Sequence, residues 1–171
     1  MQLKVFDVDF IKRSREIIEQ YDKYVLPNVA AASQYEVTLL INCLLGLLIL
    51  PKERKRHKIP DLPIAGLPDW GIRTDYITKP GKDCVGRPRT AEYLTVLELV
   101  TDLRHSVAHI LFKPLGDGKD ITHLEFHTDR SKVKLNVPVT DFRVFVKKLA
   151  DCVLCEPEEV PQKVVDDAPM A

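Results

Sequence analysis

The stretch Leu103-Arg104-His105-Ser106-Val107-Ala108-His109-Ile110 places three ionisable side chains inside a segment that otherwise has the apolar pattern of a packed helix. Over residues 91–112, apolar side chains recur at three- and four-residue steps and fall on one face of a helical wheel. Arg104 lies inside this apolar stripe, where a guanidinium needs a partner. We therefore predict a helix here, capped by Thr90, whose charged groups face a cleft or a subunit interface.

A second strip on the predicted helix is polar and ends in two histidines. Its members lie three or four positions apart, within reach of one another, and are Glu98, Asp102, His105 and His109. Asp102 lies one turn before His105 and is placed to orient its ring. A structural interpretation competes with the functional one, because Arg104 can extend from the core edge to water and both histidines can be surface residues. The pattern alone leaves both interpretations open.

Two further helices are predicted before this stretch. Residues 9–25 carry an amphipathic pattern that ends at Pro27. Asn28 can cap a second helix that runs to Leu50 and stops at Pro51. Because the second helix is apolar nearly all round, we expect it at the centre of a bundle or in a dimer face.

The second helix has two polar exceptions, Glu36 and Asn42. We interpret them as residues that support the stretch Leu103–Ile110, which we call the motif. A buried Glu36 would need a cation, and Arg104 is the nearest candidate by residue type. We advance this ion pair as a hypothesis, against the alternative that Glu36 is solvated near the start of its helix.

The chain after the motif changes from strands to a helix. Residues 121–126 and 133–137 have the alternation of a β-hairpin, and residues 141–154 have the pattern of an amphipathic helix. The predicted fold class is mostly α, a bundle of about four helices with a small β-hairpin before the last helix. We expect residues 1–155 to form a single domain and the acidic, proline-containing residues 156–171 to be a disordered tail.

A basic run follows the second helix, within a loop rich in proline and glycine over residues 51–89. Most such runs are simply solvated. If the motif faces RNA, the run supplies phosphate contacts, whose strength falls as salt rises. The side chains concerned are Lys52, Arg54, Lys55, Arg56 and Lys58.

The composition narrows the class of protein. The 171 residues carry 25 basic and 25 acidic side chains, and without the acidic tail the balance becomes about +4, far from that of a constitutive nucleic-acid binder. Four cysteines in a chain of this length do not suggest a secreted disulfide framework. No signal peptide is visible, and the longest apolar run, from Val37 to Leu50, falls short of the ~20 residues that span a bilayer. We expect a cytoplasmic protein with no membrane partner.

The residues Arg104-His105-Ser106-Val107-Ala108-His109 resemble the R-x(4–6)-H signature of the HEPN superfamily, the higher eukaryotes and prokaryotes nucleotide-binding domains. The segment from Tyr35 to Glu53 resembles a plasmid-associated bacterial branch of this superfamily, and the likeness extends over residues 8–150. The resemblance implies an all-helical domain whose homodimer brings two copies of the motif to one cleft. It also implies an endoribonuclease that needs no metal or cofactor and leaves 2′,3′-cyclic phosphate ends on RNA.

The resemblance also implies roles within the motif. It assigns proton transfer to His109, phosphate binding to Arg104, and positioning or shared proton transfer to His105. Imidazole suits proton transfer near neutral pH, and a guanidinium suits phosphate because it stays charged and planar. A toxin or antiphage role follows from the family, with an antitoxin or regulatory protein as partner. Leu111 stands where some HEPN toxins have a tyrosine that their partner modifies, so control of that kind is not expected.

Two other classes of function stay open. A non-catalytic HEPN dimer could bind nucleotide, RNA or a regulatory partner in the same cleft. A metal-dependent hydrolase could use His105 and His109, which lie four residues apart, but the glutamate of an H-E-x-x-H motif is missing between them.

Overall fold

The computed structural model describes residues 3–28, 35–83, 85–116 and 120–155. The predicted disordered tail, residues 156–171, lies outside these ranges. The segment after Asn28, where the second helix was expected to begin, also lies outside them over residues 29–34.

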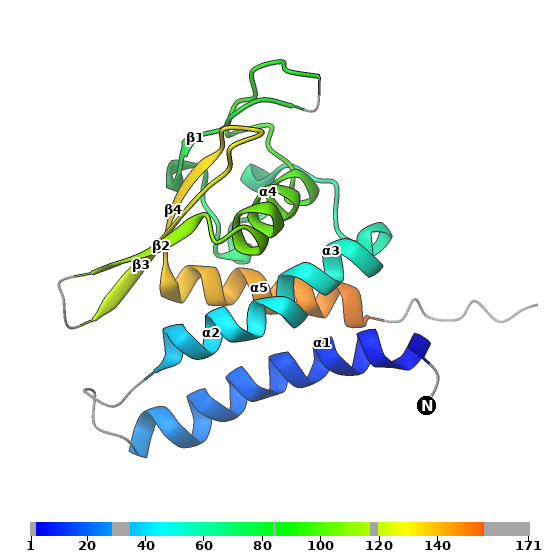
Figure 1. Cartoon of the computed structure of the whole chain (residues 1–171), viewed down its shortest axis with the longest axis vertical. Coiled ribbons are helices and arrows are strands. Elements are labelled where there is room, and N and C mark those ends of the chain that lie inside the picture. The colour runs from blue at the N-terminus through cyan, green and yellow to red at the C-terminus, as the bar shows by residue number, and fades with distance from the viewer. Residues whose placement is uncertain (1–2, 29–34, 84, 117–119, 156–171) are drawn as a thin grey trace, which may run out of the picture.

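Helices make up most of the structure, and a small antiparallel sheet lies to one side of them (Figure 1). The α-helices in the described ranges are α1 (Leu3–Gln20), α2 (Glu36–Leu44), α3 (Leu50–Arg54), α4 (Val96–Ala108) and α5 (Val139–Leu154). The strands are β1 (Ile77–Lys79), β2 (Phe112–Gly116), β3 (Ile121–His127) and β4 (Lys134–Pro138), paired in the order β1-β4-β3-β2. The predicted fold class, mostly α with a hairpin before the last helix, is confirmed.

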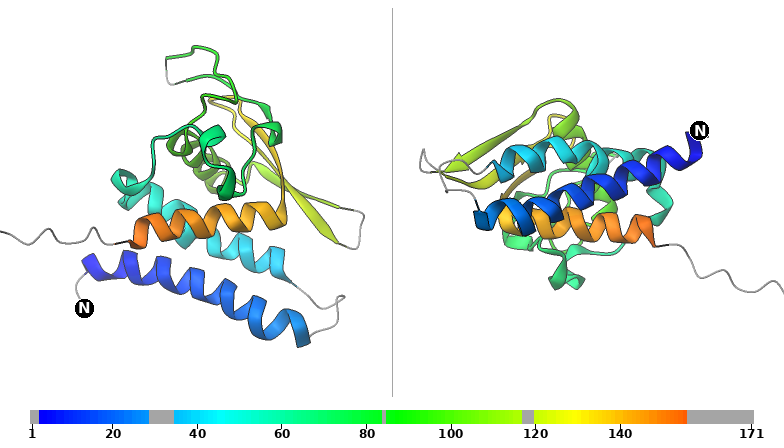
Figure 2. Two further views of the ribbon diagram at one scale, coloured as in Figure 1. Left: turned by 180° about the vertical axis from the view of Figure 1, so that it is seen from behind. Right: turned by 90° about the horizontal axis from the view of Figure 1, so that it is seen from below.

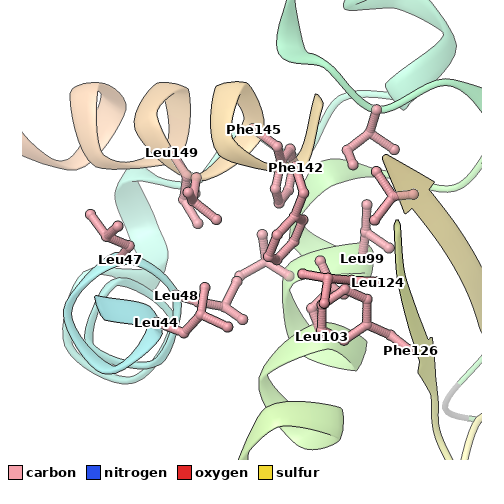
Figure 3. Packing of buried hydrophobic residues seen from close by; sticks show 14 of the residues in the cluster. Leu44, Leu47, Leu48, Leu99, Leu103, Leu124, Phe126, Phe142, Phe145 and Leu149 are labelled. Carbon is pink, nitrogen blue, oxygen red and sulfur yellow. The ribbon is translucent and has the colours of Figure 1, made fainter. Parts of the chain in front are cut away.

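The elements are layered around one core. α1, α2 and α5 lie side by side, and α4 packs between this helical layer and β3 (Figures 1 and 2). Figure 3 shows Leu44 and Leu48 of the second helix turned toward Leu103 of α4. Buried residues from Ile11 to Val153 belong to this one cluster.

The first helix begins earlier than its apolar pattern predicts, at Leu3, and continues through a π-helical turn, Tyr21–Val25. It approaches the second helix closely where its buried Ser14 faces Gly46. A Cβ atom added to Gly46 would lie 2.1 Å from the Ser14 Oγ, so only glycine fits at this contact. The close approach lets the apolar side chains of the two helices meet.

The second helix does not stop at Pro51, so that prediction is wrong. α2 continues through a π-helical turn, Leu45–Ile49, into α3, and Pro51 is the second residue of α3. In the π turn the Leu50 N–H donates to the Leu45 carbonyl, one residue further back than in an α-helix. We attribute the tolerance to this wider turn, because proline has no N–H and its ring clashes with a regular preceding turn. The helix thereby reaches Arg54.

The motif helix is shorter than predicted. α4 begins after Thr95, whose hydroxyl accepts from the Glu98 N–H while the Glu98 carboxylate accepts from the Thr95 N–H, a capping box. The expected cap, Thr90, lies in the preceding loop. α4 ends at Ala108, and β2 follows as an edge strand that the sequence pattern did not predict. Pro114 is tolerated there because an edge strand has unpaired N–H positions.

The long segment between α3 and α4 is attached to the bundle. It contains short 3-10 turns and strand β1, which pairs with β4. The Trp70 ring lies 6.1 Å from that of Phe145 on α5, and the Tyr76 hydroxyl donates to Asp141 at 2.5 Å. Both aromatic side chains therefore serve packing and hold this segment against α5.

Candidate functional site

The motif helix ends inside the motif, at a turn around His109. The Ile110 N–H donates to the Val107 carbonyl at 3.2 Å, and the Leu111 N–H donates to the Ser106 carbonyl at 2.8 Å. This is the Schellman pattern, which requires a residue in the left-handed region; Ile110 takes that place with a φ of 56°. As a result, His109 is exposed at the end of α4.

The two histidines of the motif are neighbours in space. The ring centroids of His105 and His109 are 4.4 Å apart, and their planes are inclined by 47°. His105 is half-buried, whereas His109 is exposed. Among the residues described, no group of three or more His, Cys, Asp or Glu side chains could hold a metal ion. The pair therefore offers adjacent imidazoles, which can exchange or share protons with a bound substrate.

Arg104 forms an ion pair with Glu53. Its Nε lies 2.7 Å from the Glu53 Oε1, and the two side chains are 34% and 44% exposed. The N–H on that buried nitrogen is not aligned for a hydrogen bond to the carboxylate. Across the described ranges, no other ion pair or hydrogen bond involves this guanidinium, so its terminal nitrogens can accept an anionic ligand.

The predicted ion pair between Arg104 and Glu36 is wrong. Glu36 is half-buried in the first turn of α2, and no ion pair of the described residues includes it. The physical reason is the continuation of the second helix past Pro51. That extra turn carries Glu53 to α4, where it neutralises the arginine at the edge of the core.

Asp102 points into the protein rather than toward the histidines. One carboxylate oxygen accepts from the Arg89 guanidinium at 2.7 Å, and the other accepts from the Ser131 hydroxyl at 2.5 Å. The side chains of Asp102 and Arg89 are only 10% and 11% exposed. Because both oxygens serve this network, the expectation that Asp102 orients the His105 ring is wrong. The network instead joins α4 to the loop before it and to the β3–β4 turn.

The predicted RNA-binding side chains divide into separate groups. Lys58 donates to the backbone carbonyls of Val153 and Cys155, at 3.1 and 3.0 Å, and so caps the carboxyl end of α5. Arg54 and Arg56 are exposed, while Lys52 and Lys55 are half-buried. Asn42, the remaining predicted supporting residue, is exposed on α2.

An open groove of about 490 Å³ lies beside the motif, and we call it the α3–α4 groove. Its walls carry the acids Glu53 and Asp61 and the basic side chains Arg54, Arg56 and His57. Ile59 and Leu97 supply apolar surface. Glu53 is thus shared by the groove and the ion pair with Arg104.

Sequence reasoning missed Glu53, Asp61 and Arg89 as residues of the site or its support. Glu53 had one available signal, since it is the single acid inside the basic run that follows the second helix. Asp61 and Arg89 had no such signal, because their positions depend on how the proline-rich segment folds back on the bundle.

The fold and the site together define a mostly helical domain that presents an arginine and two histidines at the end of one helix. The family model described as HEPN pEK499 p136 matches residues 1–159, and the chain therefore belongs to the HEPN superfamily, in the plasmid-associated branch. No curated protein and no solved structure matches the chain. HEPN domains serve nucleotide- and RNA-related functions, are often ribonucleases and typically dimerise. No helix in the described ranges is long and apolar enough to cross a membrane.

Proposed function

We propose that this protein is a metal-independent endoribonuclease that acts as a homodimer in the cytoplasm. The observation that supports the proposal is that the carboxyl end of α4 carries Arg104, whose terminal nitrogens have no partner in the described ranges, and the adjacent rings of His105 and His109. These are the side-chain types that RNA cleavage without a metal requires.

The reaction requires a general base, a general acid and a cation from the protein. A base removes the proton from the 2′-hydroxyl, whose oxygen then attacks the adjacent phosphorus. An acid donates a proton to the 5′-oxygen as its bond to phosphorus breaks, which leaves a 2′,3′-cyclic phosphate and a free 5′-hydroxyl. Arg104 binds the phosphate and stabilises the charge that develops on its oxygens.

His109 is the proposed proton-transfer residue because it is the exposed member of the pair. His105 is the proposed positioning residue, since its half-buried ring lies 4.4 Å from that of His109. A homodimer would supply the base and the acid from two copies of His109. The exposed strip formed by Thr38 and Asn42 of α2 and by Leu45 of the π-helical turn is our candidate for contact with the second protomer.

The cellular role that we propose is that of a toxin or an antiphage effector, held in check by an antitoxin or regulatory protein. One observation favours a second candidate, a non-catalytic HEPN dimer that binds nucleotide, RNA or a regulatory partner. Arg104 is already paired with Glu53, as in a site that need not engage a scissile phosphate.

The deciding experiment compares the full-length protein with its Arg104→Ala and His109→Ala variants on a mixed RNA panel in EDTA. Cleavage that leaves cyclic phosphate ends, and that both variants lose while they still dimerise, would support the ribonuclease. Binding of RNA without cleavage by any form would favour the second candidate. Cleavage that requires added metal would contradict the proposed mechanism.

A further inference from the structure

The α3–α4 groove begins where the motif arginine ends. Glu53 lines the groove and also contacts Arg104 at 2.7 Å. Leu97, which forms part of the groove wall, lies about two turns before Arg104 on the same side of α4. An RNA strand held at Arg104 would therefore lie next to the groove.

The size and lining of the groove suit one nucleotide. Its volume of about 490 Å³ lies within the range of small-molecule sites. Arg54 and Arg56 are exposed cations that can bind a phosphate, and the ring of His57 with the apolar surface of Leu97 can contact a base. From this we infer that the groove is a subsite for the RNA nucleotide next to the bond that is cleaved. The inference rests on the proposed function.

Asp61 gives the subsite a preference among bases. It is exposed, and no ion pair in the described part of the chain includes it, whereas the other groove acid, Glu53, is paired with Arg104. A carboxylate repels phosphate but accepts hydrogen bonds from an exocyclic amino group, such as that at the 4-position of cytosine. Uracil has a carbonyl at that position, which the carboxylate repels. The groove therefore prefers cytidine to uridine.

Binding of 2′-O-methyl hexanucleotides tests this inference separately from cleavage, because they lack the attacking 2′-hydroxyl. Fluorescence anisotropy with the full-length protein should show oligo(C) binding about 10-fold more tightly than oligo(U). Asp61→Asn should reduce that ratio to about 2-fold or less, since an amide can also donate to the uracil carbonyl.

Matched variants distinguish the groove from general basic charge. Arg56→Ala should weaken the binding of both oligomers to a similar extent. It should also lower the slope of log affinity against log salt concentration by about one phosphate contact. Arg130→Ala and Lys148→Ala remove exposed cations outside the groove and should leave both affinities unchanged.

The outcomes separate the subsite from the ribonuclease. Discrimination that depends on Asp61, in a protein that cuts no RNA, would support the subsite and contradict the ribonuclease. RNA cleavage combined with equal binding of the two oligomers would overturn the subsite alone. Loss of binding in Arg130→Ala rather than Arg56→Ala would also overturn it. Displacement of the oligomers by hexaglutamate at equal concentration would instead assign the groove to an acidic protein segment.

Discussion

Arg104 and Glu53 meet at 2.7 Å across two helices that are separated in the chain by the whole proline-rich segment. The contact joins the Nε of the guanidinium to one carboxylate oxygen, and no ion pair or hydrogen bond in the described ranges involves the terminal nitrogens. An arginine held by one edge is oriented before substrate arrives, which lowers the entropic cost of binding a phosphate in one geometry.

If Glu53 orients Arg104, then Glu53→Ala should lower kcat about 10-fold or more with a smaller change in KM, because a misaligned cation stabilises the transition state poorly. Glu53→Gln keeps an oxygen acceptor and should therefore lower kcat less than Glu53→Ala does. Steady-state kinetics on a cleaved RNA measures both. Glu92→Ala removes an exposed acid elsewhere and should have no effect. An increase in kcat/KM for Glu53→Ala would mean that Glu53 blocks the arginine instead.

The Asp102 network predicts a loss of stability rather than a specific loss of proton transfer. Asp102→Ala leaves the nearly buried Arg89 guanidinium with a single carboxylate, that of Glu98 at 3.6 Å, and with the Pro80 carbonyl, to which its Nε donates at 3.1 Å. The free energy of unfolding should fall by about 3 kcal/mol, the lower end for breaking a buried pair. Urea unfolding followed by circular dichroism measures this change. A variant as stable as the wild type but inactive would show that Asp102 acts on the histidines.

Much of the fold follows from local pattern. The hairpin of β3 and β4 and the buried side of α5 have clear alternation or helical spacing, and the structure confirms both. The predictions from sequence are wrong where a non-local contact or an unusual turn decides which secondary structure forms. Pro51 is usually a helix terminator, but the preceding π-helical turn admits it. β2 was not predicted because Pro114 and Gly116 are typical of a turn, and because the strand depends on its pairing with β3.

The candidate site was only partly predictable for the same reason. The positions of His105 and His109 depend on one helix, so their spacing predicts that they are neighbours. The partner of Arg104 depends on the length of another helix, and that of Asp102 depends on a loop and a turn. Residue type alone cannot choose between Glu36 and Glu53 without that tertiary information.

Ile110 should limit the stability of the isolated protein. Its φ of 56° is costly for a β-branched residue, and its side chain is 79% exposed, so little apolar burial offsets the strain. Ile110→Gly should raise the free energy of unfolding by about 1 kcal/mol, whereas Ile110→Ala, which keeps the strain, should not. Urea midpoints at several protein concentrations test this. Destabilisation that grows with protein concentration would show that Ile110 is buried against a second copy.

The contact of Gly46 with Ser14 should tolerate no added side chain. Gly46→Ala places a Cβ 2.1 Å from the Ser14 Oγ and 2.7 Å from its Cβ, and should cost about 1–3 kcal/mol of stability. Adding Ser14→Ala removes only the nearer clash and should restore part of the loss. Gly66→Ala is the matched control, because its Cβ would meet open space. Equal stability of the Gly46 and Gly66 variants would mean that α1 moves freely against the second helix.

The sheet should lose stability in acid through Glu125. The hydrogen bond that Lys134 donates at 2.9 Å holds the pKa of this carboxyl below its usual range, and the charge of Lys113 adds to the effect. Since the pKa is lower in the folded state, the stabilisation is complete above the unfolded value, about 4.3, and is lost as the pH falls through the folded one.

The urea midpoint of the wild type should therefore exceed that of Glu125→Gln by a constant amount above about pH 5, and the difference should close on further acidification. High salt should reduce this difference in urea midpoint, because Lys113 and Lys134 are 64% and 41% exposed. If the urea midpoint of Glu125→Gln stays below that of the wild type by the same amount from pH 7 to pH 3, the effect comes from hydrogen-bond geometry and not from charge.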